Sequence, residues 1–416
     1  MKVIVIGGGI IGLSAAYYLK KNGHEVTVID KSDFTNNCSF GSSGYICPSH
    51  FIPLATPTNV KRGIKWMFNS KSPFYIQPRL NVELMSWALK FMRSAKSKKV
   101  EAAAIPLRDL SLFSKAAYES WLQNPSFDFG YEQKGLLEIF QTEKYANHAH
   151  HIYEKAHELG LTDTVMLTAE ELQALEPQTK VNGMGALLYH CDAQCNPNLL
   201  MKNLKQYLQD QQVHFIAHEE VIQFEKKNKT VTKTITTKNA YESDEIVIAN
   251  GSFSVATAKL LQLNIPLIPG RGYSVTYEDS PYQLNYPALL MEGRAAVTPI
   301  GKNKIRFGGT MEITSYKTPV RMNRVQGILE TVKRFYPEFD APMPTVENVW
   351  YGYRPCSADG LPFIGRPSSF ENITIATGHS MLGISLGAGT GKLVGEIVDR
   401  KKTGMDITPF RVERFR

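Results

Sequence analysis

Three glycines near the start of the chain have the spacing of a phosphate-binding turn. Gly7, Gly9 and Gly12 follow a β-branched run at residues 3–6, and a helical pattern begins directly after them. In such a turn the first glycine permits the tight bend, the second lets a pyrophosphate approach the backbone, and the third lets the helix lie close to the sheet. These residues predict that the chain binds a dinucleotide.

An acidic residue closes the same β-α-β unit. Asp30 ends a second apolar strand at residues 26–29, near the distance of roughly 20 residues expected for the acid that binds a ribose. Its carboxylate would accept hydrogen bonds from both ribose hydroxyls and would repel a 2′-phosphate. The N–H groups of Ile10 and Ile11, at the helix start, would face the phosphates. This stretch leaves NAD and FAD as alternatives.

A glycine-rich turn far along the chain decides between these two dinucleotides. Residues 377–383, TGHSMLG, lie between a strand predicted at 373–376 and a helix predicted at 384–400. FAD is long, so a segment separate from the adenine site must hold its ring, whereas a nicotinamide domain needs no such segment. The helix N-terminus near Gly383 would stabilise the negative charge of a reduced flavin. We therefore predict FAD as the cofactor.

Arg354 is the residue best suited to bind a carboxylate. It lies in the segment YGYRP at residues 351–355, shortly before the glycine-rich turn. A guanidinium stays charged and binds a carboxylate through two parallel hydrogen bonds. The alternative for this residue is an interdomain salt bridge.

A long loop follows the second strand. Residues 36–57 are rich in Asn, Ser, Gly, Cys and Pro, and loops longer than about 12 residues within a compact domain are often functional. Its hydroxyls and bare backbone N–H groups suit a phosphate or a flavin edge. A flexible surface loop is the alternative.

The composition is that of a globular protein with more than one domain. The chain has 416 residues, of which 43% are apolar and 21% are charged, so it exceeds one ordinary core. No segment approaches about 18 consecutive apolar residues, so no transmembrane helix is expected. A cleaved signal peptide would remove the dinucleotide site, so we expect a cytoplasmic protein. The five cysteines are scattered, and since Cys191 and Cys195 lack a second ligand pair we expect no metal.

The net charge of +8 favours anionic ligands or surfaces. No basic run is interleaved with stacking aromatic residues, so we expect no nucleic-acid partner. A helix predicted around residues 84–99 ends in five basic residues. Two interpretations are open: contact with a membrane surface such as the inner face of the cytoplasmic membrane, or an ordinary amphipathic helix packed on a core.

Local patterns predict the elements between these sites. A capping box at Thr168 and Glu171 begins a helix. An apolar strand at 245–249 ends in Ala249, Asn250 and Gly251, a second place where backbone could meet the cofactor. The remaining predictions are a hairpin at 130–142, helices at 143–160 and 198–211, and strands at 185–189, 213–224 and 229–238.

Taken together, these motifs resemble the D-amino-acid oxidase / glycine oxidase (DAO) superfamily of FAD-dependent oxidoreductases, and most of all its bacterial D-amino acid dehydrogenases. The resemblance covers nearly the whole chain. It rests on VIVIGGGIIGLSAAYYL, CSFGSSGYICP, PGRGYSV, KIRFGGTMEI, YGYRPCSADGLPFIG and TGHSMLGISLGAGTGKLV.

The resemblance implies an α/β, two-domain FAD-binding fold. A Rossmann-like βαβ FAD domain is interleaved with an α+β substrate domain built on a large mixed sheet. Residues 1–80, 193–262 and 346–416 would form the FAD-binding domain, and residues 81–192 and 263–345 the substrate-binding domain.

The resemblance also implies roles for single residues. Arg354 would bind the substrate carboxylate, Met311 would line the pocket, and Tyr273 would form its wall or a hydrogen bond. We expect FAD to be bound without a covalent link, with attachment to His50 as the alternative. The residues expected to bind FAD are Gly7, Gly9, Ile10, Ile11, Gly12, Asp30, Lys31, Ser39, Ser42, Ser43, Gly44, Val221, Ala249, Asn250, Gly251, Arg354, Gly378, Met381, Leu382, Gly383 and Ile384.

The implied reaction is the FAD-dependent oxidative deamination of a D-amino acid. A hydride would leave Cα for flavin N5, and the resulting imine would hydrolyse to a 2-oxo acid and ammonia. Electrons would pass to a quinone or another acceptor. Alternatives are a D-hydroxyproline or D-proline dehydrogenase, a glycine or sarcosine oxidase that uses O2, a nicotinamide-dependent dehydrogenase, and a flavin-bound redox adaptor without catalysis.

Overall fold

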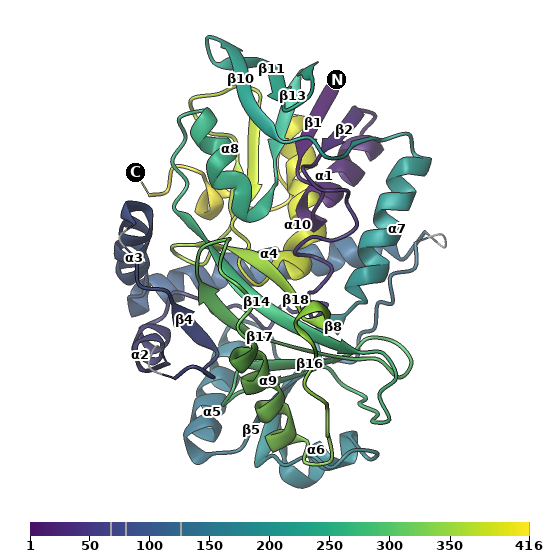
Figure 1. The fold of residues 1–416 in the computed structure, drawn as a ribbon, viewed down its shortest axis with the longest axis vertical. Helices are drawn as coiled ribbons and strands as arrows, with labels where there is room; N and C mark the ends of the chain where they lie inside the picture. The colour runs from purple at the N-terminus through teal and green to yellow at the C-terminus, as the bar shows by residue number, and fades with distance from the viewer. Residues whose placement is uncertain (67–68, 80, 125–126, 416) are drawn as a thin grey trace.

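Two large β-sheets and the helices around them organise the chain (Figure 1). The computed structural model describes residues 1–66, 69–79, 81–124 and 127–415. Among these residues the strands form a six-stranded sheet and a nine-stranded sheet. In the view of Figure 1 the first lies in the upper half and the second in the lower half. The predicted domain limits at residues 80 and 416 lie outside the described residues.

The six-stranded sheet has the order β19-β20-β13-β1-β2-β9. Its strands are parallel to their neighbours except β19, which is antiparallel to β20. Val3, Val5 and Ile248 are fully or almost fully buried, as expected for strands covered on both faces. The strands are β1 (Lys2–Ile6), β2 (Glu25–Ile29), β9 (His214–Ile216), β13 (Glu245–Ile248), β19 (Phe363–Gly365) and β20 (Ile373–Thr377).

Two helices from opposite ends of the chain pack closely beside this sheet, α1 (Ile10–Lys21) and α10 (Gly383–Val398). A Cβ on Gly391 of α10 would lie 2.4 Å from the carbonyl carbon of Ser14 in α1, so only glycine permits this approach. The long helix α4 (Ser97–Trp121) packs on the other side of α10, where Gly389 faces the backbone of Ser114. The helices α7 (Pro197–Asp210) and α8 (Ser254–Leu260) complete this half.

The nine-stranded sheet is mixed, with the order β18-β14-β17-β16-β15-β5-β7-β6 and with β4 paired to β17. The pairs β15–β5 and β4–β17 are parallel and the others are antiparallel. The strands are β4 (Phe74–Ile76), β5 (Leu136–Phe140), β6 (Thr164–Thr168), β7 (Gly185–Tyr189), β14 (Leu267–Tyr277), β15 (Ala288–Leu290), β16 (Ala295–Pro299), β17 (Ile305–Ile313) and β18 (Trp350–Ser357).

Helices and short strands surround the two sheets. In Figure 1, α9 and α5 lie against the nine-stranded sheet, while α2 and α3 lie beside β4. These helices are α2 (Pro57–Trp66), α3 (Val82–Ser94), α5 (Glu143–Glu158), α6 (Ala169–Leu175) and α9 (Met322–Phe335). The short strands are β3 (Tyr45–Ile46), β8 (Ala193–Gln194), β10 (Val221–Lys227), β11 (Thr230–Thr236) and β12 (Ala240–Glu242), and the 3-10 turns are η1 (Gly251–Phe253), η2 (Val346–Asn348) and η3 (Thr408–Phe410).

This architecture confirms the predicted α/β fold with a Rossmann-like β-α-β unit and a large mixed sheet. The division into two domains stays a prediction. The strands β4 and β18, which that division assigns to the FAD-binding part, both pair within the nine-stranded sheet.

Most element predictions agree with the structure, and three differ. The helix predicted around 84–99 is interrupted at Ala95 and Lys96, between α3 and α4. The capping box at Thr168 is present, with both of its hydrogen bonds. The hairpin predicted at 130–142 is absent from the described residues, because residues 136–140 pair with β7 and β15 rather than with the preceding segment. The strand predicted at 213–224 is divided between two sheets, and His218 between them has a φ of 58°.

A buried carboxylate ties together the middle of the nine-stranded sheet. Glu312 of β17 is fully buried. Its oxygens accept hydrogen bonds from Arg271, with Nη2 at 2.6 Å, and from the hydroxyl of Tyr273 at 2.7 Å. The Nε of Arg324 lies 2.8 Å from the second oxygen. One negative charge therefore neutralises arginines from β14 and α9.

Strand β17 also contains a bulge next to this carboxylate. The register with β14 shifts between the pairs Arg271–Glu312 and Tyr273–Gly309. Within the bulge Thr310 has a φ of 66°, which is rare for a β-branched residue. The bulge therefore redirects the backbone of residue 310 out of the regular ladder.

We expect Gly391→Ala to lower the free energy of unfolding by about 1–3 kcal/mol, because the new methyl group would overlap the backbone of α1. Gly395→Ala is the matched control, since its Cβ would lie 3.1 Å from that of Tyr18 and alanine favours the helix by up to about 1 kcal/mol. Urea unfolding followed by circular dichroism measures both variants. Equal effects at the two positions would contradict the close contact.

We expect Glu312→Gln to destabilise the protein by about 3–5 kcal/mol, because it leaves buried arginines without a counter-charge. Asp340→Asn serves as the control. It removes the exposed ion pair with Lys333, and its loss should stay below about 1 kcal/mol. The same unfolding measurement compares the two, and a small loss for Glu312→Gln would show that the arginines do not depend on this carboxylate.

Candidate active site

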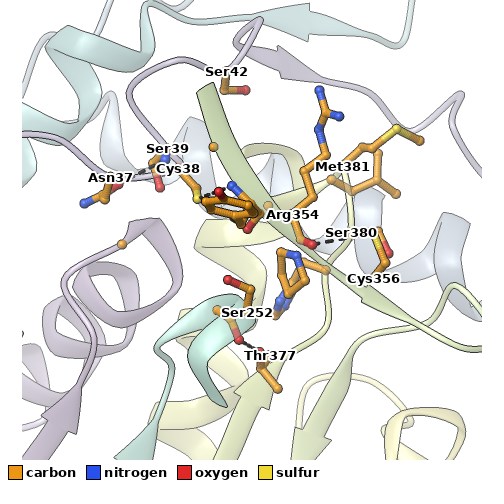
Figure 2. A pocket seen from close by; sticks show the side chains of 18 of the residues that line it. Asn37, Cys38, Ser39, Ser42, Ser252, Arg354, Cys356, Thr377, Ser380 and Met381 are labelled. Atoms are coloured by element: carbon orange, nitrogen blue, oxygen red, sulfur yellow. Dashed lines mark hydrogen bonds between the residues drawn. The ribbon is translucent and has the colours of Figure 1, made fainter. Parts of the chain in front are cut away.

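A cavity of about 970 Å³ lies between the two sheets, and residues from both sheets line it. Figure 2 shows that segments distant in sequence meet there: Asn37, Cys38 and Ser39 from the loop after β2, Arg354 from β18, and Met381 from the turn before α10. The cavity therefore joins the two regions in which the sequence predicts cofactor and substrate residues.

The predicted dinucleotide turn forms one end of this cavity. Gly7, with a φ of 113°, lies against the backbone of Asn250, where a Cβ would be 2.6 Å from the Asn250 Cα. Gly9 precedes α1 without a side-chain cap, and a Cβ there would meet only the hydroxyl of Ser39, at 3.7 Å. Apart from the N–H of Ile10, which donates to the hydroxyl of Ser39, the free N–H groups of this helix start suit a pyrophosphate.

Asp30 lies at the predicted place beside this turn. Its carboxylate accepts hydrogen bonds from the N–H of Gly8 at 2.6 Å and from the N–H and hydroxyl of Ser32 at 2.8 and 2.7 Å. The ammonium of Lys31 lies 3.3 Å from the centre of the Phe253 ring. Each carboxylate oxygen has two lone pairs, so Asp30 can still accept from a ribose.

The loop after β2 is held against the cavity. The hydroxyl of Ser39 accepts a hydrogen bond from the N–H of Ile10 at 3.0 Å. Arg306 of β17 donates to the carbonyl oxygens of Phe40 and Ser42, at 2.8 and 2.6 Å. Burial lowers the pKa of this arginine to about 10. The loop is thus a fixed part of the cavity wall rather than a flexible surface segment.

A second uncapped helix start faces the same cavity. Leu382 precedes α10 and makes no side-chain cap, and a Cβ on Gly383 would meet nothing within 4 Å. The residues expected to bind FAD that line the cavity are Gly7, Gly9, Ile10, Ile11, Asp30, Lys31, Ser39, Ser42, Ser43, Val221, Ala249, Asn250, Gly251, Arg354, Met381, Leu382, Gly383 and Ile384.

Three of the glycines expected at the cofactor are packing positions behind the cavity wall. A Cβ on Gly12 would lie 1.9 Å from the carbonyl oxygen of Gly7. Gly44 and Gly378 have φ angles of 79° and 83°, and both are backed by other residues. They shape the turns whose neighbours line the cavity.

The arrangement fits an extended dinucleotide such as FAD. The helix start at Gly9 suits the pyrophosphate. A second helix start, at Gly383, suits the anionic edge of the flavin ring, which lies far from the adenine end of FAD. At Gly9, Gly251 and Gly383 the missing side chains leave open space.

Arg354 reaches the cavity from β18. Its Nη1 donates to the carbonyl oxygen of Thr310 in the β17 bulge at 2.5 Å, and its guanidinium lies over Gly272, where any Cβ would overlap it at 2.2 Å. In the described part of the chain it forms no ion pair with an acidic residue. Burial lowers the pKa of Arg354, as expected for a cation whose partner is missing.

Tyr273 and Met311 also line the cavity. The hydroxyl of Tyr273 donates to Glu312 and accepts from the N–H of Arg321 at 3.2 Å, so the structure favours a wall role over a hydrogen bond to substrate. The sulfur of Met311 packs against Gly270, where a Cβ would lie only 2.2 Å from it.

Three residues of this region have no individual role in the sequence-based prediction. Arg294 lines the cavity from the turn after β15, Arg306 fixes the loop, and Thr310 holds Arg354. Isolated arginines in a strand or turn have no motif. His50, whose role the sequence leaves open, lines the cavity, and burial followed by the charge of Arg294 lowers its pKa to about 4.

Within the described residues no group of three or more His, Cys, Asp or Glu side chains is arranged to hold a metal ion. A search of the described helices finds none with the length and apolar character needed to span a membrane.

Curated relatives match nearly the whole chain. A D-amino acid dehydrogenase of Helicobacter pylori strain J99 is 30% identical over 402 residues, which are 95% of this chain and 94% of that protein. One from Vibrio atlanticus is 28% identical over 423 residues, which are 100% of both chains.

Solved structures share the fold over comparable lengths. Glycine oxidase from Geobacillus kaustophilus has a TM-score of 0.79 at 22% identity, covering 99% of this chain and 98% of that one. L-proline dehydrogenase from P. horikoshii has a TM-score of 0.73 at 21% identity, covering 100% and 97%. The family described as FAD dependent oxidoreductase (DAO) matches residues 2–397. The chain therefore belongs to the DAO family of FAD-dependent oxidoreductases.

Proposed function

We propose that the protein is a D-amino acid dehydrogenase, which oxidises the C–N bond beside the carboxylate of a D-amino acid. The observation that carries this proposal is Arg354, a half-buried guanidinium at the cavity wall without an acidic partner in the described part of the chain. The names of the relatives support the same substrate class.

Arg354 would fix the substrate by its carboxylate. One of its N–H groups is committed to Thr310, which orients the guanidinium plane and leaves the remaining donors for a carboxylate. Orientation of this kind is a large part of catalysis in a reaction that needs two groups aligned. Non-covalently bound FAD supplies the two-electron acceptor.

The walls around Arg354 contribute shape rather than acid–base chemistry. Tyr273 is engaged with Glu312, and the buried His379 donates to or accepts from Thr390 at 3.0 Å. An amino group that arrives neutral needs no side-chain base, and the imine product hydrolyses in water to a 2-oxo acid and ammonia.

We further propose that α3 contacts the inner face of the cytoplasmic membrane. Its residues Val82, Met85 and Leu89 are 82%, 58% and 53% exposed, although all are apolar. Its opposite face carries Trp87 and Phe91, which line the cavity. The exposed basic residues at the end of α3 and the start of α4 are Arg93, Lys96, Lys98 and Lys99. Exposed apolar groups beside cations suit an anionic lipid surface.

This position of α3 suggests the electron acceptor. A single helix separates the proposed lipid surface from the cavity, so a lipid-soluble quinone could be reduced there. We therefore favour a quinone over O2. The alternative is an amine oxidase that uses O2, and the experiment with vesicles below distinguishes the two acceptors.

Arg354→Met should raise KM for the amino acid by at least about 100-fold, because a buried charged hydrogen-bond partner of the carboxylate is lost. The KM of Arg354→Lys should lie between those of the unaltered enzyme and Arg354→Met, since lysine keeps the charge but lacks the two parallel donors of a guanidinium. An anaerobic screen of D- and L-amino acids for flavin bleaching measures the effect. Unchanged flavin absorbance near 450 nm shows that FAD is still bound. An unaltered KM would contradict the assigned role of Arg354.

Replacing Met85 and Leu89 together by Glu should lower binding to anionic vesicles about tenfold, because two apolar contacts are lost and two negative charges are added. Leu112→Glu, at a site on α4 that is 40% exposed, is the control and should bind as the unaltered protein does. Co-sedimentation measures binding, and vesicles that contain quinone measure electron transfer. Rapid reoxidation by air with peroxide formation would instead favour an oxidase.

A further inference from the structure

Arg294 brings a second guanidinium to the cavity wall. It lies in the turn between β15 and β16 and lines the cavity, with a φ of 51° that is uncommon for a residue other than glycine. No hydrogen bond or ion pair joins its side chain to another residue that the structure describes. A backbone held in a sparsely populated conformation at a cavity is often associated with function.

Arg294 and Arg354 both contact β17, at adjacent residues of that strand. A Cβ on Gly309 would lie 3.5 Å from the carbonyl oxygen of Arg294. The next residue, Thr310, accepts the hydrogen bond of Arg354. The β15–β16 turn and β18 therefore each bring an arginine to the cavity beside the same part of β17.

A second arginine, Arg62, and two histidines that are neutral near pH 7 lie near Arg294. Burial, and secondarily the charge of Arg294, lowers the pKa of His50 to about 4. Burial followed by Arg62 and Arg294 lowers the pKa of His148 to about 4. Arg62 of α2 lies over the ring of Tyr145, and its buried Nη1 has no hydrogen-bond partner in the described part of the chain.

Glu138 is an acidic residue that interacts with the charge of Arg294. Burial raises the pKa of Glu138, and Arg294 and the hydroxyl of Tyr189 oppose that change. The Glu138 carboxylate accepts from Tyr189 at 3.2 Å and forms no ion pair with Arg294 in the described residues. We call Arg294, which lines the cavity, and its neighbour Arg62 the cationic corner.

We propose that the cationic corner binds a second anionic group on the substrate, so that dicarboxylic amino acids such as D-glutamate or D-aspartate are preferred. The inference rests on the proposed function, since Arg354 would hold the α-carboxylate. Arg294 forms no hydrogen bond or ion pair with the described residues, and a carboxylate from the ligand would give its guanidinium a partner. The pyrophosphate of FAD is a less suitable partner, because its predicted turn belongs to the six-stranded sheet.

The test compares D-glutamate with its neutral isostere D-glutamine, and with D-alanine, in anaerobic flavin reduction. The unaltered enzyme should have a kcat/KM about tenfold or more higher for D-glutamate than for D-glutamine. Arg294→Met should lower kcat/KM for D-glutamate about tenfold, with a loss below about threefold for the other two. Lys302→Met is the matched control, since it removes an exposed charge in the β16–β17 turn and should leave all three values unchanged.

A binding measurement separates this inference from the proposed function. Titration with glutarate, a dicarboxylate that cannot be oxidised in this way, should perturb the flavin spectrum at concentrations about tenfold lower than butyrate does, and Arg294→Met should remove that difference. If no amino acid bleaches the flavin, the proposed function fails and glutarate still decides the inference. Equal losses for all three amino acids with Arg294→Met, or equal binding of glutarate and butyrate, would overturn it.

Discussion

The contact between α1 and α10 is the constraint on which the rest of the structure depends. Gly391 allows the backbones of the two helices to meet without intervening side chains. The two helices pack along their lengths, and their N-termini, at Gly9 and Gly383, both open onto the cavity without side-chain caps. A long anionic cofactor requires two positive sites at a fixed separation, and this helix pair provides a rigid frame for them.

The nine-stranded sheet meets a different requirement, which is to hold a cation in a place from which water is largely removed. The Glu312 carboxylate neutralises Arg271 of β14 and Arg324 of α9. The adjacent bulge at Thr310 turns one carbonyl oxygen toward Arg354. Since Glu312 is already shared by Arg271, Arg324 and Tyr273, Arg354 is left for a ligand. Under the proposed function, an arginine is structural where the Glu312 carboxylate is within reach and is available to a ligand where it is not.

The sequence predicted what local patterns can encode. The β1–α1–β2 unit, the position of Asp30, the final strand-turn-helix and the FAD cofactor were accessible because glycine spacing and apolar periodicity act over short distances. The pairing of Arg271 with Glu312 and the position of Arg294 were not, because they join residues brought together only by strand order. The hairpin predicted at 130–142 failed for the same reason, since the partners of β5 lie about 50 and 150 residues farther along the chain.

The placement of β20 and α10 has a consequence for how the protein is made. β20 lies beside β13 within the six-stranded sheet, and α10 packs on α1, which is synthesised much earlier. The cofactor cavity therefore has no complete wall until residue 398 has been synthesised. Until then β13 exposes an unpaired edge, and the face of α1 that meets Gly391 stays uncovered. The cavity expected to hold the cofactor is thus completed only late in translation, after most of the chain has been made.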